Sequence, residues 1–495
     1  MPPPLALLSP AISGAYDPDR FRADGHALID ALADQLARWH DREGWVVPPY
    51  EPSAARESWA ARYPVSGPDA RGVLVADLMA AVRGSTALAN PRCMAHQVPP
   101  PLPGAVLAEA VSALLNNGMA VMEMGPAAVP IELVVLDWMC RKLGLPAGAG
   151  GVLTSGGSLG NLTALLAMRQ AHAGFDVWSR GAHAGPPLAV IVSADAHYSI
   201  ARAVRVLGWG DGGAIRADYD AAHRMSAAAV ERALATAPAD RRVIGIVASA
   251  GSTATGAFDP LPELADLAAA RGLWLHVDAA HGGSVAVSAS QRGKLVGIER
   301  ADSVVWDAHK LLMMPALVTG VLFKRESHAY AAFAQEASYL FAAGGGSGAA
   351  TWWELGQRTL ECTKRMMALE LWSTLRAQGE EWFGEVVDRQ YALARALAVR
   401  LEEAPDFTLA LAPESNIVCY QHVPASKAGD PAALDAHNRA LRAAVVADGR
   451  FYIVGTALPA GYHLRSTLMN PLIEERDLDE LLAHLRQLAA TACPA

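Results

Sequence analysis

The chain has 495 residues, of which 52% are hydrophobic and 18% are charged, and its 41 basic and 50 acidic residues give a formal net charge of −9. This composition is typical of a well-buried enzyme subunit or of two or three domains, and it excludes a disordered chain. The acidic balance argues against a general nucleic-acid binder, because such a protein needs a basic surface.

The cysteines and the apolar stretches indicate the compartment. Five scattered cysteines form no CxxC pair, so we expect a reduced, cytoplasmic protein without a zinc site. The N-terminus lacks a basic region before its short apolar stretch, which argues against a signal peptide. Stretches such as "AVLAEAVSALL" are too short to cross a membrane, so we expect no association with a membrane.

Residues 1–100 are predicted to form an N-terminal helical segment. Within it, residues 17–42 place apolar side chains at helical spacing, and the Pro-rich stretch "VVPPYEPS" then interrupts the pattern. A second Pro-rich stretch, "HQVPPPLPG", precedes the helical pattern of "AVLAEAVSALLNNGMAV".

Residues 101–384 are predicted to form a large α/β domain. Short apolar strands alternate there with Ala-rich helices, which indicates a mainly parallel sheet covered on both faces. The predicted strands are 188–193, 242–249, 273–279, 302–308 and 319–324. Residues 385–495 alternate helices and strands and are predicted to form a small C-terminal α+β domain.

The segment "TSGGSLGNLTALLAMRQA" contains a loop of small residues, 155–158, that runs into a predicted helix. Exposed N–H groups, the helix dipole and a serine hydroxyl suit a phosphate group. The loop matches neither a GK[ST] phosphate loop nor a GxGxxG fingerprint. Taken alone, it favours a simple tight turn.

Asp278 ends a buried strand in "WLHVDAAHGG". An ionised carboxylate there needs a cationic partner, for which a pyridinium N–H would serve, although the aspartate could simply cap a turn. A metal site of His276, Asp278 and His281 is a further alternative. It is disfavoured because residues 276 and 278 share a strand face while residue 281 lies beyond the strand.

Two further sites follow strands, at Lys310 in "SVVWDAHKLL" and at His197 in "SADAHYS". A desolvated lysine can form a Schiff base with a carbonyl, although most lysines only lie at the surface. His197 alone is typical of a hydrogen-bonded loop histidine. Because open α/β sheets bind ligands at the carboxyl ends of their strands, the four sites together favour a ligand pocket.

With these motifs, the chain resembles the pyridoxal-phosphate-dependent group II amino-acid decarboxylases, a family that includes the aromatic amino-acid, glutamate, cysteine-sulfinate and diaminobutyrate decarboxylases. The resemblance covers nearly the whole chain and runs in order through "NPRCMAHQ", "MGPAAVPIE", "TSGGSLGN", "HYS", "AGSTATGAFDP", "HVDAAHGG", "DAHK" and "LRSTLMNP". It implies a fold-type I enzyme, similar to aspartate aminotransferase, with pyridoxal phosphate as cofactor. It also implies a homodimer with shared active sites.

The resemblance also implies roles for the matching positions. Lys310 would form the Schiff base, Asp278 would pair with the ring nitrogen and His197 would stack on the ring, so these three would be catalytic. The other implied cofactor contacts are Ala280 on the opposite ring face, Thr253 near the ring hydroxyl, Gly157 and Ser158 at the phosphate, and Asp307 and His309 beside the lysine. Arg465 would receive the substrate carboxylate as a bidentate ion pair.

The expected reaction is α-decarboxylation of an L-amino acid to the amine and CO2. An enzyme of the same fold with diverted chemistry is one alternative, either oxidative to an aldehyde or decarboxylation-dependent transamination. A silent binding homologue is the other, and retention of Lys310, Asp278 and His197 argues against it. The substrate stays open, with Arg92 and His96 as candidates to bind an acidic side chain.

The chain departs from the family pattern at a loop whose tyrosine usually protonates the carbon that has lost CO2. Counting back from "ECTKR" places Trp353 at that position, and an indole N–H is no useful acid. Diverted chemistry would follow from this substitution. Alternatively, Tyr339, His197 or a water supplies the proton, and ordinary amine is made. The Gly-rich segment 342–350, expected to close over a neighbouring pocket, is consistent with the implied homodimer.

Overall fold

The computed structural model describes residues 9–62, 74–333 and 352–492, which form two compact units. The larger unit comprises Ala95–Asn438 and Val454–Pro471, and the smaller comprises Met1–Met94, Arg439–Ile453 and Leu472–Ala495. The division at residues 100 and 384 stays a prediction. Tyr339 and the Gly-rich segment 342–350 lie outside the described residues.

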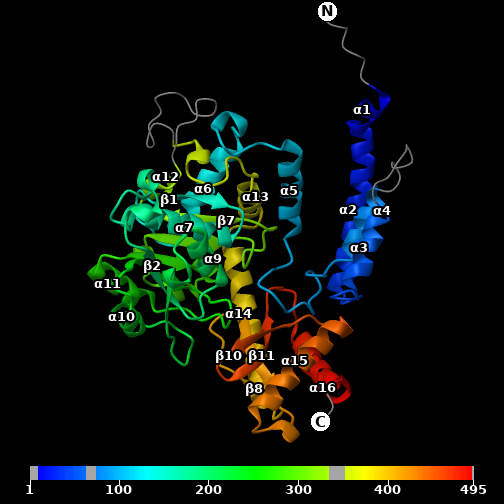
Figure 1. The fold of residues 1–495 in the computed structure, drawn as a ribbon. Helices are drawn as coiled ribbons and strands as arrows, with labels where there is room; N and C mark the ends of the chain where they lie inside the picture. Colours follow the sequence, from blue (N-terminus) through cyan, green and yellow to red (C-terminus); the bar gives the residue numbers. More distant parts are fainter. Residues whose placement is uncertain (1–8, 63–73, 334–351, 493–495) are drawn as a thin grey trace, which may run out of the picture. The chain divides into compact units, whose positions relative to one another are not determined.

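A seven-stranded sheet forms the centre of the larger unit (Figure 1). Its strand order is β1-β7-β6-β5-β4-β2-β3, and β7 runs antiparallel to both of its neighbours while the other pairings are parallel. The predicted, mainly parallel sheet is therefore confirmed. The strands are β1 (Gly150–Thr154), β2 (Leu188–Ser193), β3 (Ala214–Ala217), β4 (Arg242–Ser249), β5 (Trp274–Asp278), β6 (Ser303–Asp307) and β7 (Thr319–Phe323).

Both faces of this sheet are buried, because successive strand residues point into two different hydrophobic clusters. In β6, for example, Val304 and Trp306 belong to one cluster and Val305 to the other. This arrangement explains why the strands have near-continuous apolar sequences. Helix α7 (Gly157–His172) packs on one face, while α6 (Ala128–Lys142) and α11 (Leu261–Arg271) belong to the cluster on the other.

The larger unit contains further helices and a second sheet. Helix α5 (Pro103–Leu115) packs against α13 (Ala368–Gln378), and α14 (Glu380–Glu403) packs against the second sheet. That sheet is antiparallel in the order β10-β11-β9-β8 and gives the C-terminal part its α+β character. Its strands are β8 (Phe407–Leu409), β9 (Ile417–His422), β10 (Val454–Leu458) and β11 (Gly461–Thr467). The remaining α-helices are α8 (Val177–Arg180), α9 (Tyr198–Val206), α10 (Ala227–Ala235) and α12 (Ser327–Ala331).

The smaller unit is helical, as the N-terminal pattern predicts. It contains α1 (Pro10–Ala15), α2 (Pro18–His40), α3 (Pro52–Ala60), α4 (Leu74–Arg83) and α16 (Glu475–Ala492), while α15 (Pro431–Asp448) has residues in both units. Arg42 holds Asp477 through two hydrogen bonds of 2.9 and 2.8 Å. No helix in the described parts of the chain is long and apolar enough to cross a membrane.

Candidate active site

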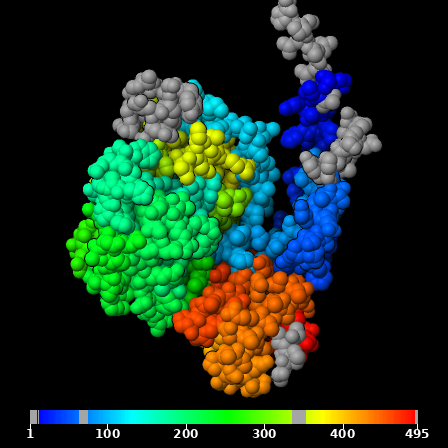
Figure 2. Space-filling view, in the orientation of Figure 1, coloured from blue at the N-terminus to red at the C-terminus, as the bar shows by residue number. Residues whose placement is uncertain are grey.

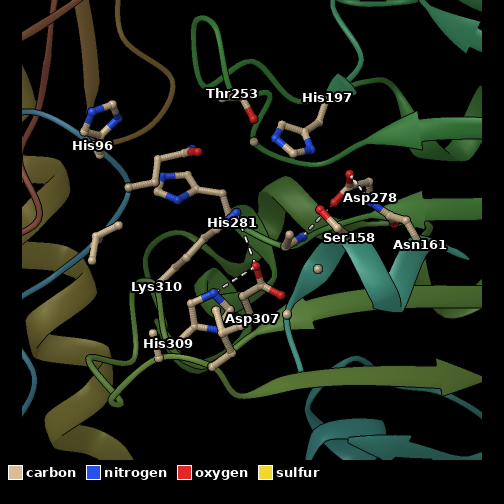
Figure 3. Close-up of a pocket in the computed structure, with 18 of the residues that line it drawn as sticks. His96, Ser158, Asn161, His197, Thr253, Asp278, His281, Asp307, His309 and Lys310 are labelled. Atoms are coloured by element: carbon tan, nitrogen blue, oxygen red, sulfur yellow. Dashed lines mark hydrogen bonds and ion pairs between the residues drawn. The ribbon is translucent and has the colours of Figure 1, made fainter. Parts of the chain in front are cut away.

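A pocket of about 670 Å³ lies in the larger unit, where the loops that follow β1, β2, β4, β5 and β6 converge (Figure 3). Each of these loops contributes side chains that were predicted from the sequence. The lining residues include Gly157, Ser158, His197, Thr253, Asp278, Ala280, Asp307, His309, Lys310 and Arg465. The structure therefore brings all ten predicted site residues together, although their roles stay predictions.

The loop after β1 leads into the N-terminus of α7. Gly156 adopts φ +96°, a backbone conformation that suits glycine, and Gly157 begins the helix. A Cβ atom on Gly157 would lie 3.1 Å from Asp307 Oδ2 and 3.5 Å from the Ala280 Cβ. Glycine therefore keeps this part of the pocket open, next to N–H groups of the first helical turn that have no intrahelical partner.

Asp278, at the end of β5, is held by hydrogen bonds from two sides. Its Oδ1 accepts from the backbone N–H of Ala280 at 3.2 Å, and its Oδ2 accepts from Asn161 Nδ2 at 2.9 Å. Figure 3 shows Asn161 reaching Asp278 from α7. These two hydrogen bonds fix the orientation of the carboxylate, which lines the pocket.

His197 is the N-cap residue of α9 and lines the pocket. Its Nδ1 lies 2.8 Å from Ser199 Oγ and 3.4 Å from the Ser199 backbone nitrogen. Burial lowers the pKa of His197 below its ordinary value, and this effect exceeds the opposing influence of the Asp278 charge. The ring is therefore neutral at pH 7.

Lys310 follows β6, and its Nζ lies 3.3 Å from Asp307 Oδ2. Asp307 is buried and also accepts from Thr319 Oγ1 at 2.6 Å. His309 places its Nε2 3.5 Å from the same Asp307 oxygen and its Nδ1 2.9 Å from the Val318 carbonyl. Asp307 thus holds the lysine amine and the histidine on one side of the pocket (Figure 3).

Arg465 reaches the pocket from β11 of the second sheet. The residue is only 7% exposed, and its Nη1 donates to the Thr253 carbonyl at 2.5 Å. Burial lowers the pKa of the guanidinium below its ordinary value. The contact joins Arg465 to the loop after β4.

His276 and His281 do not form a metal site with Asp278. His276 places its Nε2 2.9 Å from Asn161 Oδ1 and its Nδ1 2.8 Å from Ser303 Oγ, and His281 Nε2 lies 2.7 Å from Asn416 Oδ1. Burial lowers the pKa of His276 to about 4 and that of His281 to about 3. No metal-binding group of three or more His, Cys, Asp or Glu occurs among the described residues.

Of the two candidate cations for an acidic side chain, His96 lines the pocket. Arg92 belongs to the smaller unit, where it pairs with Glu480 at 2.7 Å and lies over the Phe451 ring. Trp353 is not among the described lining residues. Its side chain packs against a cluster that contains Met119, and its ring meets that of Trp352 edge to face.

Sequence reasoning missed Asn161, Ser199 and the pocket position of His281. Asn161 stands four residues after Gly157 on α7, so the two share a helix face, and that spacing was the available signal. Nothing in the sequence places Ser199 near α7, because the contact joins residues 38 positions apart.

The fold and this pocket together define a pyridoxal-phosphate enzyme of fold type I. The family model described as "Pyridoxal-dependent decarboxylase conserved domain" matches residues 84–423. The chain therefore belongs to the pyridoxal-dependent decarboxylase family and is an amino-acid decarboxylase whose cofactor is pyridoxal phosphate.

Individual relatives agree with this family. Cysteine sulfinic acid decarboxylase of Rattus norvegicus is 34% identical over 397 residues, which cover 78% of this chain and 79% of that protein. L-2,4-diaminobutyrate decarboxylase of Rhizobium meliloti (strain 1021) is 33% identical, over 79% of this chain and 76% of that protein. The crystal structure of mouse CSAD in apo form superposes with a TM-score of 0.88 at 28% identity, and the match covers 95% of this chain and 99% of that one.

The residues present fit pyridoxal phosphate. The open floor at Gly157 and the N-terminus of α7 suit the phosphate, and the fixed carboxylate of Asp278 suits the ring nitrogen. Lys310 stands across the same pocket with its amine toward Asp307.

Proposed function

We propose that this decarboxylase acts on a small L-amino acid with an anionic side chain, and that Lys310, Asp278, His197 and Arg465 have the roles predicted from the sequence. The observation that carries the substrate class is the charge of the pocket. Among its described lining residues the carboxylates are Asp278 and Asp307, and both are already hydrogen-bonded to other site groups. The other ionisable lining groups are four histidines, Tyr198, Lys310 and Arg465. Because both lining carboxylates already bind other site groups, Arg465 and His96 can face the two negative groups of an acidic amino acid, which favours such a substrate.

The chain's own residues divide the work of decarboxylation. Pyridoxal phosphate, when bound, supplies the electron sink that accepts the electron pair left by CO2. Lys310 would hold the cofactor through its amine and would release it to the substrate amine. Asp278 would hold the protonated ring nitrogen, His197 would pack against the ring, and Arg465 would orient the α-carboxylate. The partly buried positions of Lys310, Asp278 and His197 limit their contact with water, which favours loss of a charged carboxylate.

The similarity to a diaminobutyrate decarboxylase favours a second candidate, a substrate with a cationic side chain. Such a side chain needs a carboxylate, and Glu361 is a candidate for it. Glu361 Oε1 lies 2.6 Å from Oγ of the lining residue Ser155, and its Oε2 is buried without a partner among the described residues.

A panel of substrates tests the proposal. CO2 release is measured from L-cysteine sulfinate, L-aspartate, L-glutamate, L-2,4-diaminobutyrate and L-tryptophan. The proposal predicts the highest kcat/KM with one of the three acidic amino acids and a loss of that activity in His96→Leu. Preference for diaminobutyrate, lost in Glu361→Gln, would establish the second candidate instead.

The expected product is the amine, because Trp353 packs in its own hydrophobic cluster rather than in the pocket lining. The measurement is the ratio of amine to aldehyde and ammonia, in air and under nitrogen, for the wild type and Trp353→Tyr. Amine equal to the CO2 released, unchanged by oxygen or by the substitution, is the expected result. An aldehyde that depends on oxygen and declines in Trp353→Tyr would contradict it.

We further propose a cytoplasmic homodimer. The described cysteines, Cys93, Cys140, Cys362 and Cys419, form no disulfide bond with one another, which favours a reducing compartment. Helix α5 lies at the surface in Figure 2 and exposes a run of large apolar side chains that a second copy of the chain would cover. These are Val106, Leu107, Val111, Leu114 and Leu115, which are 40–70% exposed. Sedimentation should give twice the chain mass, and Leu107→Glu with Leu114→Glu should give monomers; a wild-type monomer would contradict the proposal.

A further inference from the structure

Asn161 stands at the junction of two residues to which the proposed function gives roles. The side chain is 1% exposed and makes three hydrogen bonds. Its Nδ2 donates to Asp278 Oδ2 at 2.9 Å and to Ser199 Oγ at 2.9 Å, and its Oδ1 lies 2.9 Å from His276 Nε2. An asparagine amide has two donor hydrogens and one acceptor oxygen, so all of its groups are used.

The direction of these bonds follows from Asp278. A carboxylate only accepts hydrogen bonds, so the amide nitrogen of Asn161 must face it and the amide oxygen must face His276. His276 must then donate from Nε2. Because His276 is neutral, its Nδ1 accepts from Ser303 Oγ, and Ser303 Oγ accepts from the indole N–H of Trp274 at 2.9 Å. This branch satisfies the amide oxygen of Asn161, while the orientation of the amide is set by Asp278.

The other branch reaches the pocket. Ser199 Oγ accepts from Asn161, so its single hydroxyl proton is free to be donated to His197 Nδ1, which lies 2.8 Å away. Since burial keeps His197 neutral, the ring carries its proton on Nε2. A neutral histidine that accepts at Nδ1 can donate only from Nε2.

We propose that Asn161 is a positioning residue that couples Asp278 to His197: it holds the carboxylate of Asp278 and, through Ser199, fixes the tautomer of His197 with its proton on Nε2. This inference rests on the proposed roles of Asp278 and His197. It extends them, because one side chain of α7 then sets both the group beneath the ring nitrogen and the donor that His197 offers.

The contacts allow the two branches to be cut separately. Asn161→Leu removes the bonds to Asp278 and Ser199 together. Ser199→Ala cuts only the hydroxyl link to His197 and keeps the Ser199 backbone N–H, which lies 3.4 Å from His197 Nδ1. Ser303→Ala is a matched control, because it removes a hydroxyl from the same buried network and leaves both branches to the pocket intact.

Two readouts are needed, neither of which is catalytic activity. The first is the dissociation constant of pyridoxal phosphate, measured by titrating it into the stripped protein. The second is the tautomer of His197 in the loaded protein, measured from the ring ¹⁵N shifts of ¹⁵N-histidine-labelled chains and assigned with His197→Gln. The wild type is expected to show the proton on Nε2.

Asn161→Leu is expected to weaken cofactor binding about tenfold or more, because a hydrogen bond to a charged group is lost, and also to populate the Nδ1-protonated tautomer. Ser199→Ala is expected to leave cofactor binding unchanged and to populate the Nδ1-protonated tautomer in part, because the Ser199 backbone N–H remains near Nδ1. Ser303→Ala is expected to change neither readout. If Asn161→Leu does not fold, Asn161→Asp replaces it, since it keeps the shape and places an acceptor opposite Asp278.

A His197 tautomer that stays on Nε2 in both Asn161→Leu and Ser199→Ala would overturn the coupling. Equal weakening of cofactor binding in Asn161→Leu and Ser303→Ala would also overturn the proposal, because it would show that Asn161 contributes only to packing. Asp278→Asn separates this failure from that of the proposed function. If it binds the cofactor as tightly as the wild type, the role given to Asp278 is wrong, whatever Asn161 does.

Discussion

Replacing Arg465 by lysine tests the residue proposed to bind the substrate carboxylate. The substitution keeps the positive charge but removes the planar guanidinium, which can offer two parallel N–H donors to a carboxylate. Arg465 is also the donor to the Thr253 carbonyl, and its Nε is buried with no partner among the described residues. A lysine cannot donate to Thr253 and to a substrate with the same geometry.

The size of the effect follows from the burial of this side chain. Arg465 is 7% exposed, so water cannot replace a lost hydrogen bond as it would at the surface. Loss of a buried bidentate pair costs about 2–4 kcal/mol, which corresponds to roughly a 30- to 900-fold fall in kcat/KM. Because the carboxylate is present before and during reaction, much of this loss should appear in KM.

The assay is initial-rate CO2 release with the best substrate of the panel. Arg92→Lys is the matched control, since it makes the same substitution at an arginine whose partner is Glu480. We expect the control to keep kcat/KM within about threefold of wild type. Unchanged kinetics in Arg465→Lys would mean that the carboxylate is bound elsewhere, and an equal loss in both variants would mean that the effect is not specific to the site.

Three further predictions concern the cofactor and the buried charges. Borohydride reduction of the loaded protein followed by peptide mapping should place the cofactor on Lys310, and a label on another lysine would contradict its role. Lys364→Met should destabilise the fold by about 3–5 kcal/mol in denaturant unfolding, because it leaves Glu132 buried without its ion pair; adding Glu132→Gln should restore most of the loss, and no recovery would refute the pairing argument. Burial, with Glu109 next, raises the pKa of Glu370 from 4.5 to about 10, so its stabilising contribution is present below pH 4.5 and declines as the pH rises toward 10. Glu370→Gln should flatten this decline between pH 5 and 9, and an unchanged slope would show that other groups cause it.

The part of the site that could be predicted lies at the strand ends. The strands β2, β4, β5, β6 and β7 have long apolar sequences because both of their faces are buried. Once a parallel sheet is predicted, the residues after its strands must meet at one edge, which brings His197, Asp278 and Lys310 together. Their order along the chain was therefore sufficient to predict the pocket.

Local features explain why the sequence pattern did not predict strands β1 and β3. β1 begins with two glycines, which are rare in strands, but a Cβ on Gly151 would lie 2.1 Å from the Val321 carbonyl oxygen, so close pairing with β7 requires glycine there. β3 has only four residues, pairs with β2 alone and includes the exposed Arg216, so its apolar pattern is short and broken. Tertiary pairing, which sequence periodicity does not report, makes both segments strands.

The second sheet explains why Arg465, the residue proposed to bind the substrate carboxylate, lies so far along the chain from the other site residues. Thr253 follows β4 and is predicted to lie near the ring hydroxyl, while Arg465 belongs to β11, and the hydrogen bond between them spans 212 residues. A carboxylate bound by Arg465 must share the guanidinium with the Thr253 carbonyl. Substrate binding would therefore affect the position of the Thr253 loop, because the same buried Arg465 side chain would contact both the substrate and that loop. Arginine suits this linkage, because its planar group with five N–H donors can bind a carboxylate through two parallel bonds and still donate to a backbone carbonyl, whereas a lysine ammonium cannot make the bidentate contact.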